Sequence, residues 1–373
     1  MTRALRKRAN TFSRRWRETR MFIRAMHSPH HPVLAQIIPT RRCNLACTYC
    51  NEYDKTSAPI ETAEIIRRID RLAGLGAGIV TFSGGEPTLH PDLDKLIAHV
   101  RSRGAIATLI TNGLLLTRER VEALNRAGLD YLQISIDNVT PDGVSHKSLR
   151  TLDRKLQLLA DHAEFAVTIN SVLGPELANP EDAYTIAARA RQLGFTSTVG
   201  LLHDGDGQSA ALSEAATAIY RRIRKLDQSL FSFAHQDFFQ RNLIRARPND
   251  WHCPAGRRYL YICEDGLVHY CSQQRGAPAI PLANYGPADL EREGAAVKGC
   301  APMCTVSCVH QVSMLDRFRT APDVALNDIL RASKEQDPSF REPTLVRALA
   351  WMFLHPGRRR WFGKAVVRLG GAR

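Results

Sequence analysis

No stretch of this 373-residue sequence reaches the roughly 18 uninterrupted apolar residues that a helix needs to cross a bilayer. The first 24 residues are crowded with arginine and lack the continuous apolar segment of a secretion signal. The length excludes a small disulfide-stapled scaffold, and a hydrophobic fraction of 44% argues against wholesale disorder. The sequence therefore predicts a folded protein with a cytoplasmic location.

A surplus of basic side chains is also lacking over most of the chain. The formal net charge is +14, but residues 1–24 hold nine basic side chains against Glu18, and residues 341–373 hold eight against Glu342. The body between these two segments is close to neutral, which argues against a broad phosphate-binding surface and against a nucleic acid partner. We expect the charged termini to have a function of their own.

Short apolar runs alternate with helical patterns from residue 33 to residue 202. We expect strands at 33–39, 79–82, 106–111, 131–136, 166–172 and 196–202, and helices at 61–75, 92–101, 118–126, 149–160 and 180–192. Such βα units predict an α/β fold with a parallel sheet, and a continuous run of them favours a barrel or partial barrel. In these folds the chemistry lies at the carboxyl ends of the strands.

The nine cysteines form two groups with none between Cys50 and Cys253. In a cytoplasmic chain, clustered thiols usually indicate metal binding or catalysis. The first group, Cys43, Cys47 and Cys50, has a C-x3-C-x2-C spacing, and no fourth Cys or His lies within the loop to complete a structural zinc site. Three thiolates on a [4Fe-4S] cluster leave one iron open, which suits a cluster that binds a substrate.

Polar residues and glycines follow the other expected strands: Gly84, Gly85, Glu86 and Pro87 after the second, Asn112 after the third, Ser135 and Asp137 after the fourth, and Asn170 after the fifth. Turns and strand-end caps use the same residue types, so each residue by itself has an alternative explanation. Together, however, they place polar groups around the opening of the barrel at the carboxyl ends of its strands, which we call the mouth.

With Cys43-x3-Cys47-x2-Cys50, Tyr49 before the last cysteine, and Gly84-Gly85-Glu86-Pro87 after the second strand, the sequence resembles the radical S-adenosylmethionine (radical SAM) superfamily over roughly residues 33–205. The resemblance implies a partial (β/α)6 TIM-like barrel. It also implies that the three cysteines hold a [4Fe-4S] cluster whose open iron chelates S-adenosyl-L-methionine (SAM).

The resemblance also suggests roles for the mouth residues. Tyr49 is expected against the adenine, Gly84 and Gly85 beside the methionine end, and Glu86 as an acceptor for its ammonium. The candidates for ribose and carboxylate contacts are Asn112, Ser135, Asp137 and Asn170. In this family an electron from the cluster cleaves SAM to a 5′-deoxyadenosyl radical that takes hydrogen from the substrate, so we expect a flavodoxin- or ferredoxin-like reductant as partner. We assign no catalytic acid, base or nucleophile.

The second cysteine group resembles an auxiliary-cluster module of the SPASM or twitch type. Its members are Cys253, Cys263, Cys271, Cys300, Cys304 and Cys308. The opening Cys253-x12-Gly266-x4-Cys271 matches the module, whereas the C-x3-C-x3-C ending departs from it. We expect four of the six to hold one auxiliary [4Fe-4S] cluster, with Cys253, Cys271 and Cys308 the best matches and the fourth open. Zinc and a second, partly ligated cluster are the alternatives.

A mostly apolar stripe runs along the first 30 residues with arginines on the other faces: Leu5, Ala9, Phe12, Trp16, Thr19, Ile23 and Met26. Aromatic residues among clustered arginines also mark the end of the chain, at 358–362. This composition favours an anionic membrane surface as partner and a peripheral position on the inner face of the membrane. Packing of the first helix across the base or side of the barrel, and RNA binding, are the alternatives.

These expectations divide the chain into a basic amphipathic N-terminal helix (1–30), a radical SAM partial barrel (31–210), a helical linker (211–250), an auxiliary-cluster module (251–320) and a basic amphipathic tail (321–373). The favoured function is a radical SAM enzyme acting on a lipid or lipid-linked metabolite at the membrane. The alternatives are an enzyme that modifies a peptide or protein, and an iron–sulfur electron-transfer protein without SAM turnover. A small-molecule substrate also fits.

Overall fold

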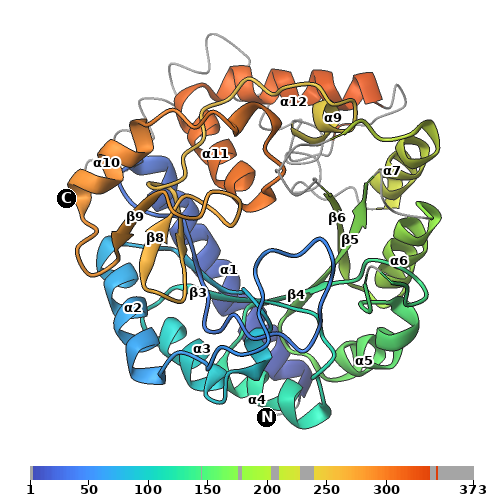
Figure 1. The fold of residues 1–373 in the computed structure, drawn as a ribbon, viewed down its shortest axis with the longest axis horizontal. Helices are drawn as coiled ribbons and strands as arrows, with labels where there is room; N and C mark the ends of the chain where they lie inside the picture. Colours follow the sequence, from blue (N-terminus) through green and yellow to red (C-terminus); the bar gives the residue numbers. More distant parts are fainter. Residues whose placement is uncertain are drawn as a thin grey trace.

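The computed structural model describes residues 3–143, 145–174, 179–202, 210–226, 239–336 and 342. Six parallel strands form its centre, each at the position that the sequence pattern predicts: β1 (Leu34–Ile37), β2 (Ile79–Phe82), β3 (Ile106–Thr111), β4 (Tyr131–Ser135), β5 (Ala166–Leu173) and β6 (Thr196–Leu201). Helices cover the outside of this curved sheet (Figure 1): α2 (Thr62–Leu75), α3 (Leu93–Ser102), α4 (Arg118–Ala127), α5 (Leu149–His162), α6 (Glu181–Gln192) and α7 (Glu214–Leu226). The predicted α/β partial barrel is confirmed.

Three strands from the C-terminal part extend the same sheet. The strand order is β6-β5-β4-β3-β2-β1-β7-β8-β9, where β7 (Tyr259–Ile262) lies parallel to β1, and β8 (Leu267–His269) and β9 (Pro278–Pro281) follow antiparallel. In this register Ala35 lies opposite Leu260. The expected cysteine-rich module is therefore joined to the barrel through backbone hydrogen bonds between β1 and β7.

The core explains why the helices lie where they do. Each barrel helix buries one apolar face against the sheet, with Leu72, Leu96, Leu124 and Leu156 all fully buried. Burial of such side chains stabilises the fold by about 2 kcal/mol each. The sheet side of this core comes from alternate strand residues such as Leu109 and Leu132, so the apolar periodicity was a sufficient signal for these elements.

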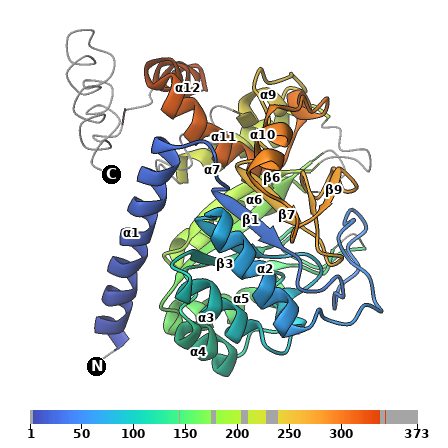
Figure 2. The same ribbon diagram turned by 90° about the vertical axis from the view of Figure 1, so that its left-hand side faces the viewer.

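The N-terminal helix α1 (Arg3–His27) lies across the base of the barrel. Its side chains reach the turns just before the strands: Arg20 donates to the carbonyl of Gly104 before β3, and Arg17 pairs with Asp130 before β4 at 2.6 Å. Figure 2 shows α1 along one side of the molecule, while the loop after β1 lies on the opposite side. Packing of this helix across the barrel base, which the sequence left as an alternative to a membrane surface, is thus present.

The C-terminal part is mostly helical beyond the β7–β9 strands. It contains α9 (Arg241–Leu243), α10 (Pro287–Ala295), the short 3-10 helix η3 (Ala301–Met303), α11 (Ser307–Thr320) and α12 (Pro322–Gln336). Of the basic tail expected at 321–373, all but α12 and residue 342 lies outside the described residues. Within the described ranges, we find no helix that is long and apolar enough to span a membrane.

Candidate active site at the carboxyl ends of the strands

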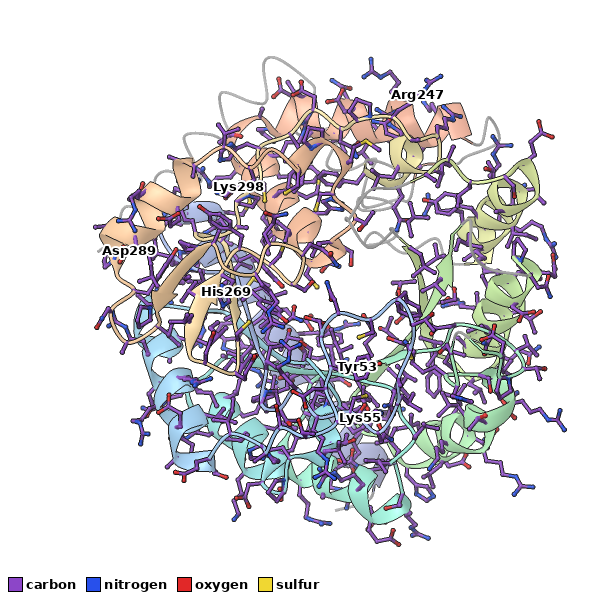
Figure 3. The ribbon with its side chains drawn as sticks, viewed as in Figure 1. Tyr53, Lys55, Arg247, His269, Asp289 and Lys298 are labelled. Atoms are coloured by element: carbon purple, nitrogen blue, oxygen red, sulfur yellow. The ribbon has the colours of Figure 1, made fainter. Side chains whose placement is uncertain are left out.

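The first cysteine loop leaves the carboxyl end of β1 and folds back on itself. The backbone N–H of Cys43 donates to the carbonyl of Asp54 at 3.0 Å, which brings the two ends of the loop together. Lys55 donates to the carbonyls of Cys43 and Leu45 at 3.2 and 2.6 Å; Figure 3 labels it on this loop. These bonds hold Cys43, Cys47 and Cys50 on one closed loop.

The three thiols are free, and Cys47 is buried. Burial raises the pKa of the Cys43 thiol and that of Cys50, although the N–H of Leu45 points at the Cys43 sulfur at 3.4 Å. Thiolates at these positions therefore need a positive partner such as metal ions. This donor set fits the cluster that the resemblance implies, because thiolates are its usual ligands.

The Gly84-Gly85 pair packs against the chain that enters the cysteine loop. A Cβ on Gly85 would lie 2.3 Å from the carbonyl oxygen of Arg41 and 2.4 Å from that of Arg42, and Gly84 has a φ of +108°. The Gly85 N–H donates to the carbonyl of Thr40 at 3.1 Å. Close packing and backbone conformation therefore explain why glycine occupies these two positions. The expected contact of the glycines with SAM stays a prediction.

Glu86 ties the loop after β2 to the end of β3. Its side chain is fully buried and accepts from Thr111 Oγ1 at 2.6 Å, from the N–H of Asn112 at 2.8 Å and from the N–H of Thr88 at 3.0 Å. Pro87 begins the short 3-10 helix η1 (Pro87–Leu89) directly after it. Protein donors thus surround the carboxylate, and its expected contact with an ammonium group is not needed to explain its burial.

Asn112 lies against the cysteine loop, as expected for a residue of the mouth. Its Nδ2 donates to Asn44 Oδ1 at 2.7 Å and lies 4.0 Å from the Cys43 sulfur. Its Oδ1 also accepts from the N–H of Leu114 at 3.0 Å, which is ordinary turn chemistry. The structure thus shows its turn bond and its contact with the cysteine loop, and its expected contact with SAM stays a prediction.

Tyr49, Asp137 and Lys147 form a chain of polar contacts beside the cysteines. Tyr49 donates to Asp137 Oδ2 at 2.5 Å, and Lys147 Nζ donates to the Tyr49 hydroxyl at 2.5 Å and lies 3.1 Å from Asp137 Oδ2. Burial alone would lower the pKa of Lys147, but the charges of Asp137 and Tyr49 outweigh it and raise this pKa. Sequence analysis missed Lys147, which lies in a loop without a recognisable spacing.

One acceptor of this group has no partner. Asp137 Oδ1 is buried and receives no hydrogen bond from any residue that the structure describes. A buried carboxylate oxygen is costly without a donor, so a ligand hydroxyl at this position would satisfy it. The unpaired acceptor and the nearby Lys147 ammonium suit a ligand with hydroxyl and carboxylate groups, as SAM has.

Ser135 and Asn170 lie opposite each other on the neighbouring strands β4 and β5. Asn170 Oδ1 accepts from Thr198 Oγ1 on β6 at 2.9 Å. The structure thus brings these two predicted residues together near the strand ends. Their expected contacts with SAM stay predictions.

In the second cysteine group, four thiols are linked by their effects on the pKa of Cys271 and Cys304. Burial first, and then the charges of Cys253 and Cys300, raise the pKa of Cys271 to about 12. Burial, followed by the charges of Cys271, Cys253 and Cys300, also raises the pKa of Cys304. Cys253, Cys271, Cys300 and Cys304 are therefore electrostatically coupled.

The other two cysteines have different surroundings. Burial and then the carboxylate of Glu52 raise the pKa of Cys308 to about 11. Cys263 lies beside Arg275 and Glu264 on the β7–β8 hairpin, where burial raises its pKa to about 12. The sequence favours Cys308 as a ligand because of its spacing, and this stays a prediction. The electrostatic coupling links Cys300 and Cys304, rather than Cys308, with Cys253 and Cys271.

Cys263, Asp265 and His269 also lie close together, with potential ligand atoms within 4.8 Å of one another. His269, labelled in Figure 3, accepts the N–H of Gly276 at Nδ1, 2.9 Å away. A neutral ring that accepts at Nδ1 carries its proton on Nε2, where a metal would have to bind. The geometry therefore fits a hydrogen-bonded hairpin better than a metal site.

The first cysteine loop contacts the β7–β8 hairpin of the C-terminal module. The Tyr261 hydroxyl on β7 donates to Glu52 on the first cysteine loop. Glu264, on the β7–β8 hairpin, lies 3.4 Å from Arg41 and 2.9 Å from Arg275. These contacts hold the hairpin against the first loop, and Glu52 between the two groups is a second residue that sequence analysis missed.

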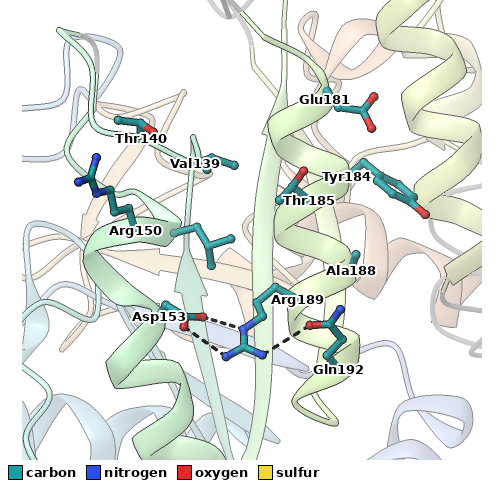
Figure 4. A pocket seen from close by; sticks show the side chains of 11 residues that line it. Val139, Thr140, Arg150, Asp153, Glu181, Tyr184, Thr185, Ala188, Arg189 and Gln192 are labelled. Atoms are coloured by element: carbon teal, nitrogen blue, oxygen red, sulfur yellow. Dashed lines mark hydrogen bonds and ion pairs between the residues drawn. The ribbon is translucent and has the colours of Figure 1, made fainter.

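A hollow of about 580 Å³ lies away from this mouth, between α5 and α6 on the outside of the barrel. Figure 4 shows Arg189 across it, paired with Asp153 through contacts of 2.7 and 3.2 Å. The arginine is thus neutralised by its neighbour, and no cysteine lines the hollow.

Comparisons with known proteins identify the family of the chain. The family model of the radical SAM superfamily matches residues 37–210. A PqqA peptide cyclase of Methylocella silvestris is 37% identical over 267 residues, which cover 66% of this chain and 69% of that protein. A PqqA peptide cyclase of Gluconobacter oxydans is 41% identical over 119 residues, but the match spans 31% of this chain and only 33% of the relative.

Solved structures share the fold at low sequence identity. Native anSMEcpe with bound AdoMet and Cp18Cys peptide has a TM-score of 0.51 at 16% identity, covering 80% of this chain and 99% of that one. Streptococcus suis SuiB bound to precursor peptide SuiA also has a TM-score of 0.51 at 16% identity, covering 77% of this chain and 73% of that one.

Proposed function

Since the chain belongs to the radical SAM superfamily and is a radical SAM enzyme, we propose that its substrate is a peptide or protein. The observation that carries this proposal is the 37% identity, over 267 residues, with a protein named PqqA peptide cyclase. The lipid or lipid-linked substrate favoured by the sequence has no support from these relatives, and the alternative of a peptide-modifying enzyme takes its place. A protein without SAM turnover is not favoured, because the relatives are enzymes.

In this proposal Cys43, Cys47 and Cys50 hold the [4Fe-4S] cluster of the superfamily. When bound, the cluster and SAM supply a radical that removes a hydrogen atom from the substrate. The chain's own contribution is to hold the loop closed through Lys55 and Asp54, and to present Lys147 and Asp137 to the polar groups of SAM. Such positioning raises the rate because the reacting atoms are held in one orientation.

We also propose an auxiliary [4Fe-4S] cluster on Cys253, Cys271, Cys300 and Cys304. A set of four thiols suits either this cluster or zinc. The Tyr261–Glu52 contact keeps the module next to the first loop, so a peptide at the mouth would lie between the two groups. A flavodoxin- or ferredoxin-like donor and a cytoplasmic location complete the proposal.

The test uses anaerobically reconstituted full-length protein with SAM and dithionite. Two substrate pools from the same cells are compared: a peptide fraction and a lipid extract. We expect the peptide fraction to stimulate 5′-deoxyadenosine formation and one peptide to change mass only when SAM is present.

The variant Cys43→Ser should abolish both signals, whereas Cys308→Ser, outside both proposed ligand sets, should keep them. Stimulation and a mass change found with the lipid extract alone would overturn the peptide proposal.

A further inference from the structure

The N-terminal helix α1 presents its apolar side to solvent. Large hydrophobic side chains along it are exposed: Leu5 by 52%, Phe12 by 76%, Trp16 by 65%, Phe22 by 48% and Ile23 by 62%. A helix that packs on a protein core normally does the reverse and buries this side. Exposed aromatic patches of this kind mark interaction surfaces.

The polar side of α1 holds it to the barrel. Arg6 pairs with Glu164 at 2.8 Å and Arg17 with Asp130 at 2.6 Å. Arg14 lies over the Tyr131 ring at 5.1 Å. Ala25, which is fully buried, and the partly buried Met21 add apolar contacts at the end of the helix. The exposed apolar side chains take no part in this packing and are left for another partner.

The outward side is also positively charged. Arg8 and Arg15 are exposed and stand one helical turn after Leu5 and Phe12 on the same side of the helix. The single acidic residue in the first 27, Glu18, accepts a hydrogen bond from Tyr131 of the barrel. The surface thus combines aromatic side chains and cations without an exposed carboxylate.

We propose that this outer face of α1, defined as Leu5, Arg8, Phe12, Arg15, Trp16, Phe22 and Ile23, binds the surface of an anionic bilayer. Interfacial helices insert apolar side chains among the lipid headgroups while their cations attract anionic lipids. Charge complementarity is what selects this partner, because the cations among the aromatic residues match anionic headgroups.

This surface fixes the orientation of the bound enzyme. Figure 2 shows α1 on the side of the barrel opposite the first cysteine loop, and its contacts fall on the turns that precede β3, β4 and β5. A bilayer at α1 therefore leaves the mouth facing the aqueous phase. The inference goes beyond the proposed function and agrees with a water-borne peptide as substrate.

The test is flotation of the full-length reconstituted enzyme with phosphatidylcholine vesicles, with and without phosphatidylglycerol, at low and high salt. We expect binding that requires phosphatidylglycerol and weakens at high salt. The double variant Phe12→Ser/Trp16→Ser should lose about ten-fold or more in partitioning. The matched control Val324→Ser removes an exposed apolar side chain from α12 and should bind like the wild type.

A second readout reports insertion directly. Brominated lipids should quench tryptophan fluorescence in the wild type, and Trp16→Phe should lose this quenching while it still floats. Unchanged helicity and 5′-deoxyadenosine formation in each variant would exclude misfolding.

Three outcomes would overturn the proposal: no flotation of the wild type, flotation only after removal of residues 337–373, and a dimer that Phe12→Ser/Trp16→Ser dissociates. The second outcome would assign the face to the chain's own C-terminal segment, and the third to a second copy. None of these outcomes depends on the peptide test, so the two proposals fail separately.

Discussion

The ammonium group of Lys147 donates a hydrogen bond to the hydroxyl of Tyr49 at 2.5 Å, across 98 positions of the sequence. The same ammonium lies 3.1 Å from Asp137, which keeps one oxygen unpaired among the described residues. A tyrosine of the cysteine loop is thereby fixed to the loop after β4. The pair therefore joins the proposed cluster site to the proposed SAM site.

Replacing Lys147 by methionine should weaken SAM binding. The change leaves the buried Asp137 carboxylate without its cation and removes the positive charge that is proposed to face SAM. We expect the Kd for SAM to rise about ten-fold, equivalent to about 1.4 kcal/mol. Equilibrium binding to the reconstituted protein measures this effect. Lys155→Met, whose ammonium donates to the carbonyl of Leu116, is the control and should leave the Kd unchanged.

Gly85→Ala should displace the first cysteine loop. The new methyl group would lie 2.3 Å from the carbonyl oxygen of Arg41 and 2.4 Å from that of Arg42, and these backbone atoms cannot move aside as the end of a side chain could. We expect a loss of about 1–3 kcal/mol in the free energy of unfolding, from overpacking. Chemical denaturation measures this loss, and iron analysis shows whether the loop still takes up a cluster. Gly143→Ala, with no atom within 4 Å of the added carbon, should change neither quantity.

Iron content should distinguish the six C-terminal cysteines. With two [4Fe-4S] clusters, the reconstituted chain should hold about eight irons, and Cys271→Ser about four. Cys308→Ser should retain about eight, because Cys308 lies outside the set of four. About four irons and one zinc in the wild type would show instead that the second group binds zinc.

His31 should make the protein sensitive to acid. Its side chain is 6% exposed, and burial, followed by the charges of Arg258 and Arg24, lowers its pKa to about 4 from an ordinary 6.5. The unfolded chain then binds more protons than the folded one between these two values, so stability is lost as the pH falls through this window. We expect the loss to be about 2 kcal/mol.

Denaturation curves of His31→Gln against wild type at pH 7 and pH 4.5 measure this contribution. The variant should show a smaller difference between the two conditions. An equal difference in both proteins would remove His31 as the cause. The exposed His27→Gln is the control and should behave like the wild type.

The barrel itself could be predicted because each strand and helix has a local signal. Strands such as Ile106–Thr111 are short apolar runs, helices such as α5 repeat leucine every three or four positions, and their observed ends lie within two residues of the expected ones. The cysteine loop and the glycine pair could also be predicted from the sequence, because their residue types are unusual at strand ends.

Contacts between distant segments could not be predicted in the same way. Lys147 has no spacing that relates it to Tyr49, and nothing near Tyr259–Ile262 indicates that this strand pairs with β1. The pattern of α1 revealed two faces but not which face packs on the barrel. The arginines of α1 pair with carboxylates at the base of the barrel. The periodicity of a single sequence cannot predict such pairs, because their partners lie far along the chain.

The pairing of β1 with β7 also determines when the protein can finish folding during its synthesis. β1 ends at Ile37, whereas its neighbour on that side begins at Tyr259, so the ribosome must make most of the chain before the pair can form. Until then the outer edge of β1 exposes unpaired backbone groups, which is a hazard for association between nascent chains. A product truncated before Tyr259 keeps that open edge permanently, whereas completion of the β7–β9 strands covers it.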